Sequence, residues 1–236
     1  TDPCSPRLIS EVIDGAGEFN DLDGAIDVVV QDGFAFVVAT ADKAVTIIDV
    51  SNPVSPRFLS MIKDGVGGFD KLDGARTLAV SGDLLFVGAD ADGAVTIVDI
   101  SDPTRPLPLG TATVGRAGAI AVDGGVLYAT SESNLSLYLF DISDPGVPTL
   151  LAQRSGLSGA FDIVVEDGYA YIAGGTAVDI FSVSDPLLPS KIGNTPSVSA
   201  TAISLDGGYL FTVSNSGSSV LDVGDPRAPK VIPNLV

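Results

Sequence analysis

The sequence predicts an all-β protein, a five-bladed β-propeller of four-stranded antiparallel blades with one surplus terminal strand. Three observations lead to this prediction. A pair of Asp or Asn followed by Pro recurs along the chain at intervals of 50, 50, 42, 41 and 40 residues. Each interval holds short apolar segments separated by turn residues, and none shows helical periodicity over ten residues or more. Four short strands in a repeat of about 40–50 residues are typical of a propeller blade. The recurring pairs are Asp2-Pro3, Asn52-Pro53, Asp102-Pro103, Asp144-Pro145, Asp185-Pro186 and Asp225-Pro226.

The first strand of each repeat starts at an alanine and is almost wholly apolar. Runs such as Val28-Val29-Val30 do not alternate with polar residues. A continuous apolar run is typical of a strand buried on both faces, as strands between neighbouring blades are. The predicted first strands are 25–30, 75–80, 117–122, 160–165 and 200–205.

A tight turn of Asp and Gly follows each first strand. Two-residue hairpin turns need positive φ, which Gly and Asp tolerate better than other residues. The turns are Asp32-Gly33, Gly82-Asp83, Gly124-Gly125, Asp167-Gly168 and Gly207-Gly208. The second strands that they lead into are predicted at 34–39, 84–89, 126–130, 169–173 and 209–213.

The third strand of each repeat ends at the Pro-containing turn, and an irregular fourth strand, such as 57–62 or 108–112, follows the turn. We interpret the Asp residues of this turn, as in the run 99–103, as acceptors of backbone amides, with Pro fixing φ at the corner. The third strands are predicted at 45–50, 95–100, 137–142, 178–183 and 220–223.

These strands and turns predict a single domain, residues 1–236, with an extra outer-strand segment at 1–13. Five copies of the first three strands are accompanied by six fourth-strand segments, because 6–13 and 229–236 both match the fourth strand. One of the two is therefore surplus. It could lie on the surface, belong to a longer array, or be donated to the open edge of another molecule. The predicted blade bounds are approximately 14–63, 64–113, 114–154, 155–193 and 194–236.

The repeat resembles the LVIVD repeat. The shared pattern is Gly-Ala, an apolar strand, Asp-Gly-Tyr/Phe-Ala-Tyr/Phe-Val, and then Val-Thr-Ile-Val-Asp-Ile-Ser-Asp-Pro, and it is matched best by 44–56, 94–106 and 137–148. The resemblance implies a β-propeller of the kind found in secreted and surface proteins of bacteria and archaea. Ser182 departs from the pattern, so the Asp of this position is not expected to be an indispensable ligand. The other repeats have Asp49, Asp99, Asp141 and Asp222 there.

Composition limits the partners of the chain. The 30 acidic residues exceed the 12 basic ones and give a net charge of −18, while 45% of residues are hydrophobic. The apolar content excludes a disordered acidic chain. The negative charge disfavours nucleic acid, and no run approaches the ~18 apolar residues of a membrane span, so membrane insertion is not expected.

We expect a secreted, extracellular or cell-surface protein. The first residue is Thr1 rather than Met, which is typical of a chain after removal of a signal peptide and also of a trimmed chain. The single cysteine, Cys4, has no partner for an internal disulfide. It is either a thiol near the chain end or the site of an intermolecular bridge.

The sequence predicts no enzyme and no catalytic residue. Without histidine, a Ser-His-Asp or Cys-His arrangement cannot form, and a zinc site lacks its usual ligands. A remote alternative is a glycoside hydrolase that uses Asp27 and Asp162, which occupy matching positions in two first strands. The equivalent residues elsewhere are not acidic, and we expect both carboxylates to be solvated or bonded to nearby amides.

Two matching acidic loops, 14–25 and 64–75, are the candidate metal sites. Their glycine-spaced oxygen side chains suit Ca²⁺, which takes about 6–8 oxygen ligands, although the spacing is not that of an EF-hand. The other interpretation is a pair of surface loops that are closed by Asx turns and pinned by a buried Phe and Leu. The candidate ligands are Asp14, Asn20, Asp23, Asp64, Asp70 and Asp73.

Two classes of function fit these observations. The first is a structural or interaction module that self-assembles head to tail into filaments by terminal strand donation, with another copy of the chain as partner. The second is a Ca²⁺-stabilised module that binds a glycan or a surface protein. Sugar stacking on exposed aromatics is not expected, because the chain has no Trp and its other aromatics lie inside the strand pattern.

Overall fold

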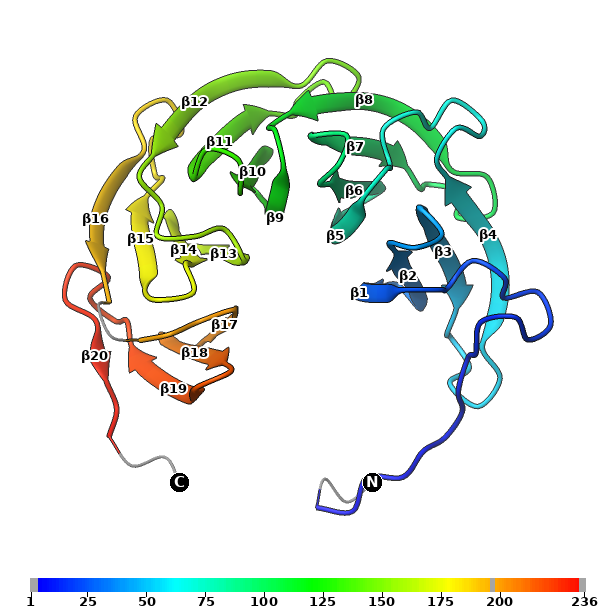
Figure 1. Ribbon diagram of the computed structural model, residues 1–236, viewed down its shortest axis with the longest axis horizontal. Coiled ribbons are helices and arrows are strands. Elements are labelled where there is room, and N and C mark those ends of the chain that lie inside the picture. Colours follow the sequence, from blue (N-terminus) through cyan, green and yellow to red (C-terminus); the bar gives the residue numbers. More distant parts are fainter. Residues whose placement is uncertain (1–3, 196–197, 234–236) are drawn as a thin grey trace. The chain divides into compact units, whose positions relative to one another are not determined.

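The computed structural model describes residues 4–195 and 198–233 and contains five four-stranded antiparallel sheets (Figure 1). In each sheet the strands are ordered as they occur in the sequence. The prediction of an all-β, five-bladed propeller fold is confirmed. The described residues contain no helix long and apolar enough to cross a membrane.

Each sheet is one blade, and we number the blades in chain order. Blade 1 consists of β1 (Ala25–Gln31), β2 (Phe34–Ala39), β3 (Ala44–Asp49) and β4 (Arg57–Lys63). Blade 2 consists of β5 (Ala75–Ser81), β6 (Leu84–Ala89), β7 (Ala94–Asp99) and β8 (Leu107–Thr113). Blade 3 consists of β9 (Ala117–Asp123), β10 (Val126–Ser131), β11 (Ser136–Asp141) and β12 (Thr149–Ser155).

Blades 4 and 5 have the same order of strands. Blade 4 consists of β13 (Asp162–Glu166), β14 (Tyr169–Ala173), β15 (Val178–Ser182) and β16 (Ser190–Asn194). Blade 5 consists of β17 (Ala202–Asp206), β18 (Tyr209–Ser214), β19 (Gly217–Asp222) and β20 (Lys230–Val231). Within residues 198–233, β20 is shorter than the other strands of blade 5.

The chain divides into two compact units. Unit 1 comprises Thr1–Asp92 and Thr96–Leu109, and unit 2 comprises Gly93–Val95 and Gly110–Val236. Unit 1 therefore holds blade 1 and most of blade 2, and unit 2 holds blades 3, 4 and 5. The predicted single domain stays a prediction, and each unit is described by itself below.

Four of the five predicted hairpin turns have positive φ at both residues, and the second has it at Gly82 alone, with φ of 56°. Asp32 and Gly33 have φ of 51° and 82°, and Asp167 and Gly168 have φ of 51° and 77°. The register that follows pairs Gln31 with Phe34 and Glu166 with Tyr169. Local turn chemistry thus sets which side chains of the first two strands share a face.

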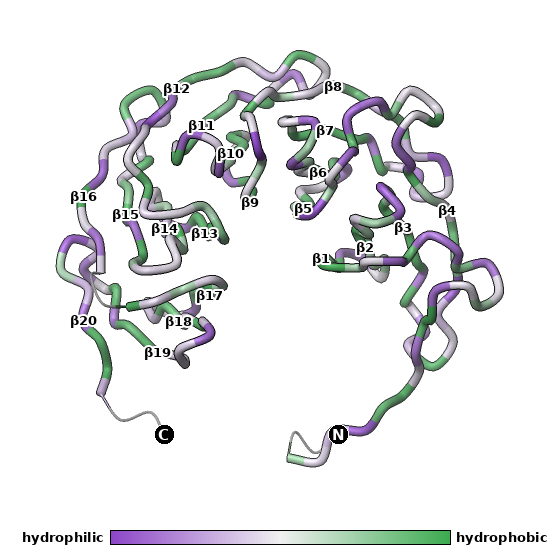
Figure 2. The backbone as a smooth tube through the Cα atoms, in the orientation of Figure 1, coloured by the Kyte–Doolittle hydropathy of each residue, from purple (hydrophilic) through white to green (hydrophobic). Residues whose placement is uncertain are grey.

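The core is built from facing sides of successive blades. We call the side of a blade that packs on the preceding blade its leading face, and the opposite side its trailing face. In unit 1, Phe36 and Ile47 of blade 1 pack with Leu78 and Val87 of blade 2. In unit 2, one cluster joins blades 3 and 4 and another joins blades 4 and 5, so strand residues at these junctions are apolar where one blade covers the next. The strands of both units carry many hydrophobic residues (Figure 2). This burial explains the high apolar content of so acidic a chain.

The segment 6–13, predicted as the surplus strand, is paired with no strand in the described structure (Figure 1). Ser10 Oγ donates a hydrogen bond to the carbonyl oxygen of Pro53, 2.6 Å away. The outer edge of β3 is already occupied by β4, so this segment cannot serve as the fourth strand of blade 1. At the other end of the chain, residues 234–236 of the predicted segment 229–236 lie outside the described residues.

Candidate functional site

The two acidic loops fold in the same way. Gly15 N donates to Phe19 O at 2.6 Å, and Gly65 N donates to Phe69 O at 2.7 Å. The carboxylate at the start of each loop accepts the amide eight residues later: Asp14 Oδ1 from Leu22 N at 3.0 Å, and Asp64 Oδ1 from Leu72 N at 3.1 Å. These carboxylates therefore close the loops from within.

The loops are also tied to the blade that they cross. The amides of Asp23 and Asp73 donate to the carboxylates of Asp42 and Asp92, each at 2.8 Å. On the third strands, the hydroxyls of Thr46 and Thr96 donate to loop carbonyls at 2.8 and 2.9 Å. In loop 64–75 the anchors Phe69 and Leu72 are buried.

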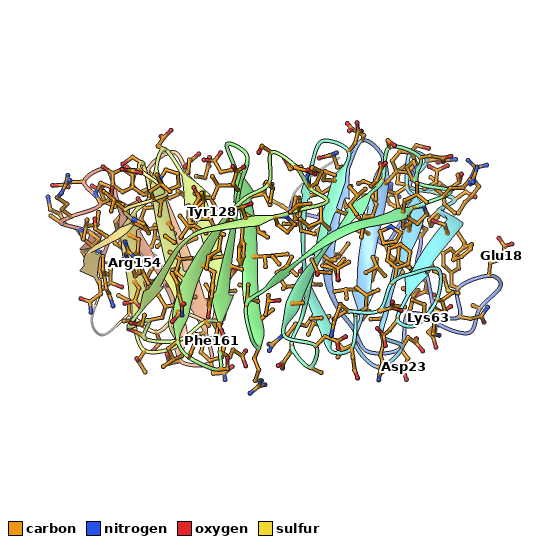
Figure 3. The ribbon with its side chains drawn as sticks, turned by 90° about the horizontal axis from the view of Figure 1, so that it is seen from above. Glu18, Asp23, Lys63, Tyr128, Arg154 and Phe161 are labelled. Carbon is orange, nitrogen blue, oxygen red and sulfur yellow. The ribbon has the colours of Figure 1, made fainter. Side chains whose placement is uncertain are left out.

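Lysine side chains supply positive charge to both loops. Lys43 Nζ lies 2.9 Å from Asp73 Oδ2, and Lys63 Nζ pairs with Asp21. A hydrogen bond to Asp73 raises the pKa of Lys43, and a hydrogen bond to Asp21 raises that of Lys63. Figure 3 shows Lys63 and Asp23 at the same end of unit 1, while Glu18 points away from the sheets. The ammonium groups thus neutralise part of the acidic charge that suggested a metal.

The structure places the six predicted metal ligands in two separate loops. Asn20 and Asp70 are exposed, Asp14 and Asp64 bind amides, and Asp73 pairs with Lys43. Within residues 4–195 and 198–233, no three His, Cys, Asp or Glu side chains are grouped so that they could hold a metal ion. The contacts agree with the interpretation as closed surface loops, and the calcium site stays a prediction.

Asp27 and Asp162 join blades. Asp27 accepts the amide of Val28 through Oδ1 and that of Leu78 in blade 2 through Oδ2, both at 2.8 Å. Asp162 accepts the amides of Ile163 and of Ile203 in blade 5 in the same way, again at 2.8 Å. Each carboxylate therefore links two neighbouring blades through backbone amides, and we call this link a carboxylate clasp. The contacts agree with the expectation that nearby amides bind these side chains.

The interpretation of the Asp residues in the Pro turns is confirmed. Asp99 accepts the amide of Ser101 at 2.9 Å, and Asp102 accepts that of Thr104 at 3.0 Å. In blade 1, hydrogen bonds from Ser51 and Arg57 lower the pKa of Asp49 to about 2. Hydrogen bonds likewise lower the pKa of Asp99, Asp102 and Asp141, so these aspartates stabilise the corners of blades 1 to 3 in their ionised form.

The sequence reasoning missed Asp179 on β15. Its side chain is fully buried. Asp179 occupies the position of the third strand that is Thr46 in blade 1 and Thr96 in blade 2. It accepts hydrogen bonds from the backbone N of Ser158 at 2.5 Å and from Ser158 Oγ at 3.0 Å, and Lys191 Nζ lies 2.7 Å away. An acidic residue inside an apolar third strand was the available signal, because such a residue needs a partner.

An apolar trailing face is exposed on blade 5. Phe211 is 44% exposed and Val213 55% exposed, and Tyr209 lies beside them on β18. The matching aromatics Phe36, Tyr128 and Tyr171 are only 1–3% exposed.

An apolar leading face is exposed on blade 1. On β1, Val28 is 55% and Val30 63% exposed, whereas the matching Leu78 of blade 2 is 5% exposed. In both faces, the exposed residues match positions that are buried in other blades of the described structure.

The outer edge of blade 5 is also incompletely paired. β20 pairs with β19 only at Leu221–Val231 and Asp222–Lys230, and Ile232 N donates to Val220 O. In blade 1, by contrast, β4 pairs along the whole of β3. No described residue is paired with the outer edge of 217–219.

The repeats and their junctions define a β-propeller made of blades of one sequence family. The model of the LVIVD repeat matches residues 24–63, 74–112, 114–153 and 159–195. The chain belongs to the LVIVD-repeat family, as the sequence pattern suggested. No curated protein matches the chain.

Solved structures share the fold at low identity. One, from Bacteroides uniformis and provisionally named a 6-phosphogluconolactonase, is 13% identical with a TM-score of 0.74, over 87% of this chain and 68% of that one. A protein of unknown function from Desulfotomaculum acetoxidans is 13% identical with a TM-score of 0.72, over 89% and 69%. The hydrazine synthase of Kuenenia stuttgartiensis is 15% identical with a TM-score of 0.64, over 94% and 70%. At such identity the likeness shows the fold alone.

Proposed function

We propose that this chain is a non-catalytic, secreted or cell-surface interaction module that associates head to tail with further copies of itself by strand donation. Residues 11–13 of one copy would extend the outer edge of blade 5 in the next copy, opposite residues 217–219, which β20 leaves unpaired. The observation that carries the proposal is the contact between Ser10 and Pro53, because the fourth strand β4 makes the same contact with blade 2: Ser60 Oγ donates to Pro103 O at 2.6 Å.

The matching contacts support the proposal that 7–13 acts as the fourth strand of a preceding blade. The sequence agrees, since Arg7, Ser10 and Asp14 match Arg57, Ser60 and Asp64. The segment therefore has the form of a fourth strand whose third strand is contributed from elsewhere.

The edge of β19 is the complementary half. In the register of β3 and β4, where Lys63 lies opposite Ala44, the donated Ile13 would lie opposite Gly217 and Val12 opposite Ser218. Backbone groups on an open strand edge gain hydrogen bonds when a further strand is added, and this gain is the usual basis of strand addition.

A non-catalytic role is supported by what the acidic side chains do. Asp27 and Asp162, the pair considered for hydrolysis, bind backbone amides of neighbouring strands.

The test is the association state of the purified chain, followed by sedimentation velocity and electron microscopy. Val12→Pro removes the backbone donor that the register of β3 and β4 directs at Ser218, and Val12→Ala is the control that keeps it. We expect the alanine variant to assemble and the proline variant to remain monomeric. Assembly by the proline variant at the level of the unchanged chain would refute strand donation.

A further inference from the structure

We infer that a pocket between blades 4 and 5 binds an alkylammonium group, the cation of a primary amine or of a lysine side chain. The site goes beyond the proposed self-association and shares no residue with the segment 7–13 or with β19. All of its residues belong to unit 2 and lie between positions 166 and 226.

The pocket lies beside two hairpin turns, the turn that joins β13 to β14 and the turn that joins β17 to β18. Its volume is about 240 Å³. Pockets for drug-sized ligands measure about 300–1,000 Å³, so this one suits a small group or a single side chain. Its walls combine two carboxylates, Glu166 and Asp167, with the aromatic Tyr169 and Tyr171 and the aliphatic Leu205.

The hydroxyl of Tyr171 is a buried polar group without a protein partner. Tyr171 is only 3% exposed, and it packs in the cluster that joins blades 4 and 5. Among the described residues, its hydroxyl makes no hydrogen bond, yet no fully enclosed side-chain oxygen or nitrogen lacks one. The hydroxyl therefore reaches the open space of the pocket. Because a buried tyrosine hydroxyl usually has a hydrogen-bond partner, we expect a ligand to provide it.

Two carboxylates give the pocket a negative charge. Within the described part of the chain, neither Glu166 nor Asp167 forms an ion pair or a side-chain hydrogen bond. Burial raises the pKa of Tyr171 to about 12, with smaller contributions from Tyr169 and the two carboxylates. At neutral pH the hydroxyl is therefore uncharged and can accept a hydrogen bond, while the carboxylates attract a cation.

A matching pocket between blades 1 and 2 shows which group is missing. There, Gln31 Nε2 donates a hydrogen bond across the junction to Gly82 O at 2.8 Å. Glu166 replaces Gln31, and a carboxylate cannot donate to the carbonyl of Gly207, which matches Gly82. The matching pocket is also smaller, at about 110 Å³. Its side chains Gln31, Asp32, Phe34 and Phe36 match Glu166, Asp167, Tyr169 and Tyr171.

The pocket of unit 2 thus offers acceptors where the pocket of unit 1 contains a donor of its own. A metal ion is a poor candidate, because no three His, Cys, Asp or Glu side chains of residues 4–195 and 198–233 are grouped to hold one. The three N–H donors of an ammonium can be shared between the Glu166 carboxylate, the Tyr171 hydroxyl and a backbone carbonyl. Tyr169 and Leu205 provide apolar contact for the methylene chain.

The test is saturation-transfer difference NMR of the full chain with n-butylammonium chloride, which detects weak ligands of monomers and assemblies alike. 1-Butanol is the uncharged control ligand. Nα-acetyl-lysine N-methylamide presents the same ammonium as a lysine side chain does. We expect saturation transfer to both ammonium compounds and none to 1-butanol. Tighter binding of the lysine derivative would assign the group to a protein partner, and tighter binding of n-butylammonium would assign it to a free amine.

Two variants locate the site, and each has a matched control. Glu166→Gln restores the amide found at Gln31 and should raise the dissociation constant for n-butylammonium at least about 10-fold, as loss of a charge-assisted hydrogen bond does. Tyr171→Phe should raise it at least about 3-fold through the lost hydroxyl. The controls, Asp32→Asn in unit 1 and Tyr128→Phe, should leave it unchanged. Tyr128 occupies the position of Tyr171 in blade 3 and is likewise 3% exposed.

Three results would overturn the inference. The first is the absence of saturation transfer to n-butylammonium, and the second is equal transfer to 1-butanol, which would show a hollow that does not recognise charge. The third is an unchanged dissociation constant in Glu166→Gln, whose exposed side chain can be replaced without loss of the fold. Circular dichroism verifies that each variant is folded. Self-association, measured by sedimentation velocity, is independent of these results because no variant alters residues 7–13 or 217–219.

Discussion

Replacing Asp179 with alanine should destabilise unit 2 strongly. The carboxylate is fully buried and accepts two hydrogen bonds from Ser158, and it pairs with Lys191 at 2.7 Å. The alanine variant leaves the Ser158 amide without this acceptor and leaves the ammonium without its counter-charge. The loop at 156–161 also loses its attachment to β15.

The magnitude follows from these contacts. Hydrogen bonds to a charged acceptor contribute about 1.5–3 kcal/mol each, and breaking a buried ion pair costs about 3–5 kcal/mol. Because the Lys191 side chain is 34% exposed, water recovers part of the loss. We therefore expect the free energy of unfolding to fall by about 3 kcal/mol. At about 2–4 °C per kcal/mol for a chain of this size, the melting temperature should fall by roughly 6–12 °C.

The assay is urea unfolding followed by circular dichroism, with Asp185→Ala as the matched control. Asp185 is an exposed turn residue of the same blade that accepts one amide, that of Leu187, at 3.0 Å. Its loss should cost no more than about 1 kcal/mol. If Asp179→Ala is no more destabilising than this control, the reasoning about the buried carboxylate is wrong.

Three further predictions concern the other carboxylates. Asp27→Ala and Asp162→Ala should each lower the free energy of unfolding by about 1–3 kcal/mol, measured by urea unfolding, through the lost clasp between blades; unchanged stability would contradict the clasp. The pKa of Asp49 is lowered from 3.8 to about 2 in the folded state, so its stabilisation is present above pH 3.8 and is lost as the pH falls toward 2. Acid titration of thermal stability should therefore show a shallower loss for Asp49→Asn, and identical profiles would refute this role. Because the loops 14–25 and 64–75 are closed by their own amide and lysine contacts, a chelator should leave the melting temperature unchanged. A chelator-induced fall that Ca²⁺ reverses would instead support the predicted calcium site.

Local sequence determined the strands, the turns and the family. Strand formation and tight turns depend on residues close together in the chain, so Asp32-Gly33 and the Asp residues near Pro103 could be interpreted without coordinates. The same local pattern recurs in five repeats, and each repeat forms one blade. The fold could therefore be predicted from the sequence almost completely.

The contacts that decide the candidate sites join residues far apart in the sequence. Lys43 meets Asp73, Lys63 meets Asp21, and Asp179 lies between Ser158 and Lys191. The residue pattern does not predict these pairings. The acidic loops therefore suggested a metal site in the sequence, whereas in the structure lysines and backbone amides bind their carboxylates.

By itself, the sequence determined that apolar residues stand on both sides of every blade, because a two-residue period assigns side chains to faces without naming what covers them. Only the tertiary structure decided which of those faces are covered: Phe36 is buried by a following blade, while the matching Phe211 is exposed. The physical reason is that a side chain is buried only where another element packs against it. Similar repeats can therefore have differently exposed faces.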